Sequence, residues 1–166
     1  MARNRKLQNL IENKYMADNA VGNAELKDDA VTQNELGAYQ TKTMAFVFGS
    51  DISQRDVGAH ALEGPTGAQA LPDNAVVTGY HVDVLTPLAS SGSATIALGF
   101  ATDGAPNVKA ATAFDDATYV AATQKGGVPA TSKKLTAARP LLATVATAAL
   151  TAGQMLIYIQ YVEGTA

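Results

Sequence analysis

The chain has 166 residues, of which 47% are hydrophobic and 16% are charged, with a formal net charge of −3. The length allows one ordinary domain plus an appendage, and the hydrophobic share allows a packed core. The charged share lies below the roughly 25% of an average soluble domain, which is tolerable when partners cover much of the surface. The acidic balance argues against broad binding of nucleic acid. The absence of cysteine excludes disulfides, thiolate nucleophiles and cysteine-based zinc sites.

The first part of the chain, 1–42, reads as an arm built from repeats of about ten residues. Residues 17–26 and 27–36 are identical at five of ten positions when aligned without gaps, and a degenerate earlier copy covers 7–16. Each unit offers too little apolar surface to fold on itself, so such a repeat gains stability by packing on neighbours. A solvated tail with a chance duplication is the alternative. Residues 5–16 also follow the helical period.

The arm supplies the candidate interface of this protein. The apolar positions of the repeats are the side chains that a neighbouring chain would bury, since polar residues separate them. They are Leu7, Leu10, Ile11, Val21, Leu26, Val31 and Leu36.

The predicted domain, 43–166, begins where the repeats end and short apolar runs bounded by turn residues follow. The apolar run 44–48 is bounded by Gly-Ser-Asp and predicts a strand followed by a turn. Residues 49–74 are rich in Gly, Ser, Asp and Pro and predict a long connection with one short strand near 58–62. A loop of this length in a compact domain is often functional or part of an interface.

The middle of the domain contains the strongest strand pattern. Residues 74–85 are rich in β-branched and aromatic side chains, and Pro87 is expected to end the strand. Residues 93–100 predict a second strand. Because Ser90-Ser91-Gly92 is a turn sequence between them, the two strands are expected to form a hairpin.

The last third predicts further short strands. Weaker candidates lie at 108–113 and 118–122, 124–134 reads as a loop, and 139–145 reads as a strand with proline at its entry. The run 154–162 is apolar on both faces, which predicts a central strand. Short strands at this spacing, without βαβ alternation, predict an all-β fold: an antiparallel, jelly-roll-like β-sandwich with an extended N-terminal arm.

No catalytic motif is present. The sequence lacks the nucleophile elbow, the phosphate loop and the dinucleotide fingerprint. Of the two histidines, His60 and His81, the second could share a strand face with Asp83 and couple to it. Asp115-Asp116 could bind a cation with Asp103, although a solvated turn is the better reading. We therefore expect no enzyme, no cofactor and no metal. No apolar run is long enough for a membrane helix, so no membrane partner is expected.

Two features resemble known phage proteins. The repeats Asp-Asn-Ala-Val-Gly-Asn-Ala-Glu-Leu and Asp-Asp-Ala-Val-Thr-Gln-Asn-Glu-Leu are similar to repeats of phage fibre proteins. The phrases at 71–78, 94–99 and 149–162 resemble small β-sandwich proteins of tailed bacteriophages, namely capsid decoration (cement) proteins and head fibres. The resemblance implies a homotrimer made in the host cytoplasm and placed on the outer capsid surface of the virion. Its partner would be the major capsid protein, without specific binding of nucleic acid.

A phage fibre or receptor-binding tip is the alternative. In that case the loops 49–74 and 124–134 would recognise the host surface. The lack of aromatic residues in these loops weighs against glycan stacking.

Overall fold

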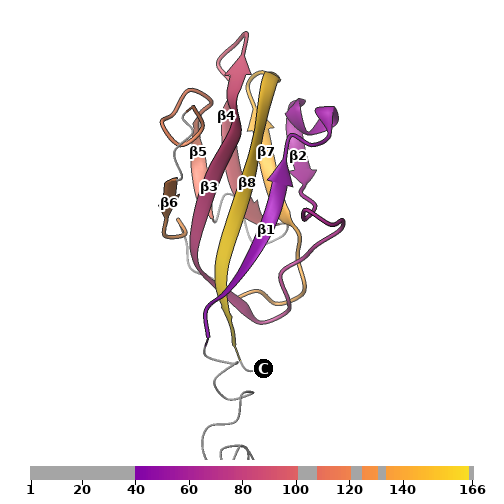
Figure 1. The fold of residues 1–166 in the computed structure, drawn as a ribbon, viewed down its shortest axis with the longest axis vertical. Coiled ribbons are helices and arrows are strands. Elements are labelled where there is room, and N and C mark those ends of the chain that lie inside the picture. The colour runs from indigo at the N-terminus through magenta and orange to yellow at the C-terminus, as the bar shows by residue number, and fades with distance from the viewer. Residues whose placement is uncertain (1–39, 101–107, 121–124, 131–133, 165–166) are drawn as a thin grey trace, which may run out of the picture. The chain divides into compact units, whose positions relative to one another are not determined.

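The computed structural model describes residues 40–100, 108–120, 125–130 and 134–164. Within these ranges the chain folds into eight antiparallel strands in two sheets, with one short 3-10 helix (Figure 1). None of the described helices is long and apolar enough to cross a membrane. The predicted interface positions of the arm lie outside the described residues. They are Leu7, Leu10, Ile11, Val21, Leu26, Val31 and Leu36.

The first sheet contains the longest strands in the order β1-β8-β3-β6. The prediction of a central strand near the C-terminus is confirmed, because β8 pairs with β1 on one side and β3 on the other. Its side chains alternate between buried and half-buried, which is the pattern of a strand with one face on a core. The strands are β1 (Lys42–Phe48), β8 (Leu150–Glu163), β3 (Ala75–Ser90) and β6 (Lys125–Gly127).

The second sheet has the order β2-β7-β4-β5. Together the two orders pair the first strand with the last, the second with the seventh, and so on inward along the chain. This pairing is the jelly-roll arrangement, in which two sheets bury one core between them. The strands are β2 (Gly58–Ala61), β7 (Leu141–Ala146), β4 (Thr95–Phe100) and β5 (Lys109–Ala113), and the 3-10 helix η2 (Ile52–Arg55) precedes β2.

The core lies between the sheets and is built from the inward positions of both. On β8 these are Met155, Ile157 and Ile159, each with no exposed surface, and on β1 they are Phe46 and Phe48. The opposite sheet contributes the alternate residues of β4 and β7, because successive side chains of a strand point to opposite faces. Further core side chains are Leu71, Val82, Ile96, Leu98, Phe100, Tyr119, Leu135 and Leu141.

The prediction of a hairpin between the strands at 74–85 and 93–100 is wrong. β3 pairs with β8 and β6, whereas β4 pairs with β7 and β5, so Ser90-Ser91-Gly92 links the two sheets rather than two neighbouring strands. The prediction that Pro87 ends the strand is also wrong, since β3 runs on to Ser90. Proline is tolerated there because the register of β3 against β8 shifts on either side of it, and such irregular positions need no amide donor.

Two smaller predictions in the last third also fail. Residues 118–120 of the predicted strand 118–122 form turns, while 121 and 122 lie outside the described residues. The reason is Asp116, whose carboxylate accepts the Thr118 N–H (2.9 Å) and whose carbonyl accepts the Tyr119 N–H (2.8 Å). Conversely, the short β6 lies inside the predicted loop 124–134.

Candidate interaction surfaces

One end of the sandwich contains the start of β1 and the end of β8. β1 begins at Lys42, one residue before the predicted start of the domain, and Lys42 pairs with Tyr161 of β8. The Lys42 ammonium lies 2.8 Å from a carboxylate oxygen of Glu163, and this hydrogen bond raises the pKa of Lys42. β1 therefore starts beside the end of β8 (Figure 1). The loop before η2 and the link between β3 and β4 lie at the opposite end.

The outer face of the β2-β7-β4-β5 sheet carries no charged side chain at any described outward position. The ionisable residues of these strands, His60 and Lys109, lie at inward positions. An antiparallel sheet that faces water normally carries polar residues on that side. This face therefore suits contact with protein. Its side chains are those of Ala59, Ala61, Thr95, Ala97, Ala110, Ala113, Leu142, Thr144 and Ala146.

The outer face of the other sheet is mixed. Leu156 and Tyr158 of β8 are half-buried there, next to Asp83 and His81 of β3 in the register of the two strands. The prediction that His81 and Asp83 share a strand face is confirmed, because both occupy outward positions of β3. No hydrogen bond or ion pair joins the side chains of His81 and Asp83.

A buried lysine lies between the open edges of the sheets. Lys109 is 8% exposed, donates from Nζ to Thr112 Oγ1 (2.7 Å), and lies 5.1 Å from the centre of the Tyr119 ring. Burial lowers the pKa of Lys109 and raises that of Tyr119. The face of the Tyr119 ring and the hydroxyl of Thr112 partly compensate the burial of the Lys109 charge. We therefore assign Lys109 a structural role. Sequence reasoning missed it, because a lone lysine among alanines normally points into water.

A polar cavity of about 330 Å³ lies beside η2 and β2. Sequence reasoning marked 49–74 as a possible interface but did not find this cavity, because its walls come from segments that only the fold brings together. Its lining residues are Ser50, Asp51, Ser53, Gln54, Ala59, His60, Ala61 and Glu63.

The structure describes a turn at Asp115 and Asp116, which is the reading that the sequence favoured over a cation site. Asp116 serves the turn described above, Asp115 is exposed beside it, and Asp103 lies outside the described residues. Among the residues that the structure describes, no group of three or more His, Cys, Asp or Glu could hold a metal ion.

Comparison with solved structures finds similar chains in three phage capsid structures. A chain of the acidic stable capsid structure of Helicobacter pylori bacteriophage KHP30 matches with a TM-score of 0.51 and 18% identity, over 74% of this chain and 86% of that chain. A chain of the cyanophage Pam1 capsid asymmetric unit matches with a TM-score of 0.49 and 17% identity, over 75% and 84%. A chain of the capsid of Ralstonia phage GP4 matches with 0.49 and 19%, over 78% and 88%.

At such low identity the likeness to the KHP30 chain shows a shared fold. No known protein family matches the sequence. No curated protein matches it as a relative.

Proposed function

We propose that this protein is a virion structural protein, a decoration or cement protein bound to the outer surface of a phage capsid. The observation that carries the proposal is a jelly-roll domain, similar to a chain of a phage capsid structure, whose first strand follows a repetitive arm. The proposed role is structural, since the sequence carries no catalytic motif that would favour an enzyme. Fold similarity alone would not support a function, and the repeats add the independent argument.

The mechanism is adhesion through the arm. The apolar repeat positions pack on subunits of the major capsid protein, and the domain stands on the shell by the end at which β1 begins. Several arms in one oligomer rebind at a high effective concentration, so modest contacts add up to firm attachment. Bridging neighbouring subunits in this way would stabilise the head against internal pressure.

A homotrimer is the proposed assembly, and the uncharged face of the β2-β7-β4-β5 sheet is the surface proposed to join its copies. Small side chains without charge let three copies of this face converge on a threefold axis without burying an unpaired ion. Light scattering on the full chain and on a chain starting at Gln40, which keeps Lys42 and its ion pair, tests this assignment. Trimers in both samples support assembly through the domain. A trimer that becomes a monomer without the arm assigns assembly to the repeats.

Co-sedimentation with phage heads that lack the protein tests the docking. Val21→Asp/Val31→Asp places two charges at apolar repeat positions, and we expect head binding to be lost. Asn23→Asp/Gln33→Asp adds the same two charges at polar positions and should bind as the unaltered chain does. Equal binding of both variants would contradict docking through the apolar positions.

A host-recognition module is the second candidate, and the cavity beside η2 is the observation that favours it. In that case the isolated protein adsorbs to host cells, whereas a decoration protein adsorbs to heads. The two adsorption assays on the same preparation separate the candidates.

A further inference from the structure

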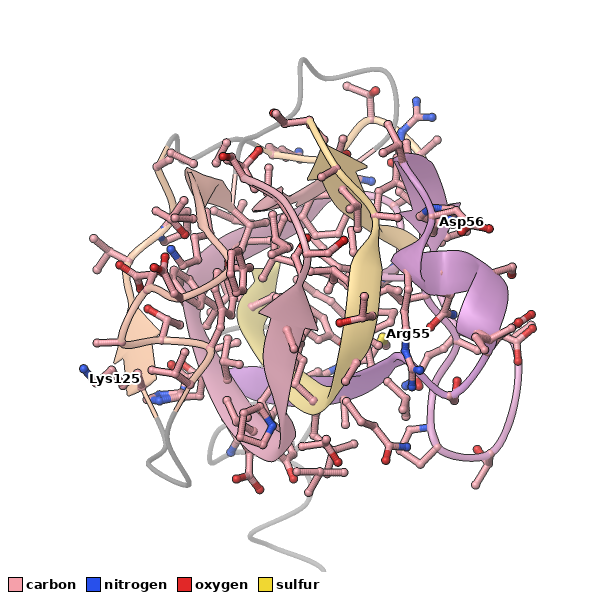
Figure 2. The ribbon with its side chains drawn as sticks, turned by 90° about the horizontal axis from the view of Figure 1, so that it is seen from above. Arg55, Asp56 and Lys125 are labelled. Carbon is pink, nitrogen blue, oxygen red and sulfur yellow. The ribbon has the colours of Figure 1, made fainter. Side chains whose placement is uncertain are left out.

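Within the described residues the two sheets end in four edge strands. β1 and β2 are the edges on the side of η2, and β6 and β5 are the edges on the other side (Figure 1). Figure 2 looks along the strands, with Arg55 and Asp56 on the first side and Lys125 of β6 on the second. An edge strand carries backbone N–H and C=O groups that its own sheet does not pair. Each edge can therefore accept a further strand unless the chain protects it.

Three of these edges are protected. β6 has three residues and β2 has four, which gives a partner strand little to pair with. The pairing of β5 with β4 has a register shift between Ile96 and Leu98, and Lys109 of β5 points inward and is buried. Very short strands, irregular pairing and inward charges are devices by which proteins prevent strand addition at an edge.

β1 has none of these devices. It has seven residues, and its register against β8 runs without a shift from Lys42 to Phe48. Its one charged side chain, that of Lys42, forms an ion pair with Glu163 of β8 (2.8 Å), so the charge is drawn toward the partner strand. β1 is therefore the longest edge strand of the described residues and is open to pairing.

The backbone of β1 shows which of its groups are free. Val47 donates its N–H to the Glu63 carbonyl (2.8 Å), so the backbone groups of Val47 point away from β8. Because this direction alternates along an antiparallel strand, the groups of Thr43 and Ala45 point the same way. Neither residue has a second backbone partner among the described residues. The open part of the edge, from Thr43 to Ala45, is about 7 Å long.

The side chains of this open part define the segment that fits beside it. Met44 is half-buried and packs against the core, whereas Thr43 is exposed and Ala45 half-buried at outward positions. Residues that lie opposite each other on neighbouring strands share a face of the sheet. A fitting segment is therefore extended and has an apolar residue opposite Met44, with small or polar residues on either side.

The position of the open part indicates which chain supplies this segment. It lies in the half of β1 where the strand begins, which is the end of the domain proposed to face the capsid. A second copy of β1 would pair through a twofold axis, and the two strands would then start in opposite directions. Only one of the two domains could stand on the shell in that arrangement. A capsid subunit can reach the edge of every domain.

We propose that β1 accepts an extended segment of a capsid subunit as an added strand along Thr43 to Ala45. The backbone hydrogen bonds supply affinity, and the residue opposite Met44 supplies selectivity. The proposal rests on capsid decoration and names the contact that the domain makes in addition to that of the arm.

Hydrogen exchange at single-amide resolution, on the full chain alone and on phage heads that lack the protein, tests the proposal. The amides of Thr43 and Ala45 should exchange fast in the free chain and at least about tenfold more slowly on heads, because each gains a hydrogen bond. The measurement needs no substitution, so it decides the question even where a variant fails to fold.

A pair of variants at one position provides the second test. Ala45→Pro removes the outward N–H but none of the hydrogen bonds to β8, since Ala45 points its backbone groups away from that strand. It should weaken head binding about tenfold or more. Ala45→Ser keeps the N–H and should bind as the unaltered chain does.

Several results would overturn the proposal. Fast exchange of Thr43 and Ala45 on heads, or equal head binding of Ala45→Pro and Ala45→Ser, would do so and leave capsid decoration standing. Slow exchange in the free chain that becomes fast on dilution would assign the edge to a second copy. Slow exchange that becomes fast in a chain starting at Gln40 would assign it to the arm. An unaltered chain that does not bind heads would overturn capsid decoration together with this proposal.

Discussion

Gly49 ends the first strand at a place where no other residue fits. Its φ is +81°, and a Cβ added there would meet the carbonyl oxygen of Gly153, with the carbonyl carbon of that residue 3.1 Å away. Both obstacles are backbone atoms of β8, so only a movement of β1 against its partner strand could relieve the clash. Gly49→Ala therefore combines a backbone penalty with overpacking.

Gly67 provides the matched control. Its φ is +124°, but an added Cβ would meet nothing within 4 Å. Gly67→Ala should cost about 1–2 kcal/mol from the left-handed backbone alone. Gly49→Ala adds about 1–3 kcal/mol of overpacking, giving roughly 2–5 kcal/mol in total.

Urea denaturation at one protein concentration measures both variants. With a slope of about 1–3 kcal/mol per molar, the midpoint of Gly49→Ala should fall roughly 1 M further than that of Gly67→Ala. Equal midpoints for the two variants would refute the claim that Gly49 is held by close approach to β8.

Three further predictions follow from burial and charge. Ile157→Ala should destabilise the domain by about 2–5 kcal/mol and Leu156→Ala by less than half of that, because only Ile157 is fully buried; thermal unfolding compares them. The hydrogen bond from Thr118 lowers the pKa of Asp116 below its ordinary 3.8. The unaltered chain should therefore be more stable than Asp116→Asn above pH 3.8, and this difference should vanish as the pH falls below the pKa of Asp116 in the folded protein. Urea midpoints of both chains across pH measure the difference. Thr144→Lys should break the proposed trimer in light scattering while the far-UV circular dichroism spectrum of the domain stays unchanged, since Thr144 points outward; an intact trimer would reject that face.

The sequence pattern predicted the strands whose apolar residues alternate or cluster. The run 154–162 lies within β8, and 93–100 covers β4, because both carry enough β-branched and aliphatic residues to bury one face. The apolar run 44–48, predicted as a strand, lies within β1. The jelly-roll expectation holds because many short strands without helices leave few other ways to cover two apolar faces.

The pattern could not predict which strands pair. β3 lies next to β8, which is about sixty residues away in sequence, and no local signal encodes that neighbour. The turn sequence before β4 looked like a hairpin because a link between two sheets needs the same small and polar residues. β6 was missed because two of its three residues are glycines, which weaken strand propensity.

The cavity and the uncharged sheet face were equally hidden from sequence reasoning. Asp51 and Glu63 are twelve positions apart and line one cavity only because η2 and β2 fold beside each other. The uncharged face needs the register of four strands to appear, since each strand alone shows only a few alanines and threonines. The arm stays a prediction from the repeats.

Cryo-electron microscopy of heads mixed with the full chain tests the central claim most directly. The account predicts sandwich-shaped density on the outer surface of the shell, with the end where β1 begins toward the capsid and the η2 end outward. Heads without added density at saturating protein, or density that places the η2 end on the shell, would contradict it.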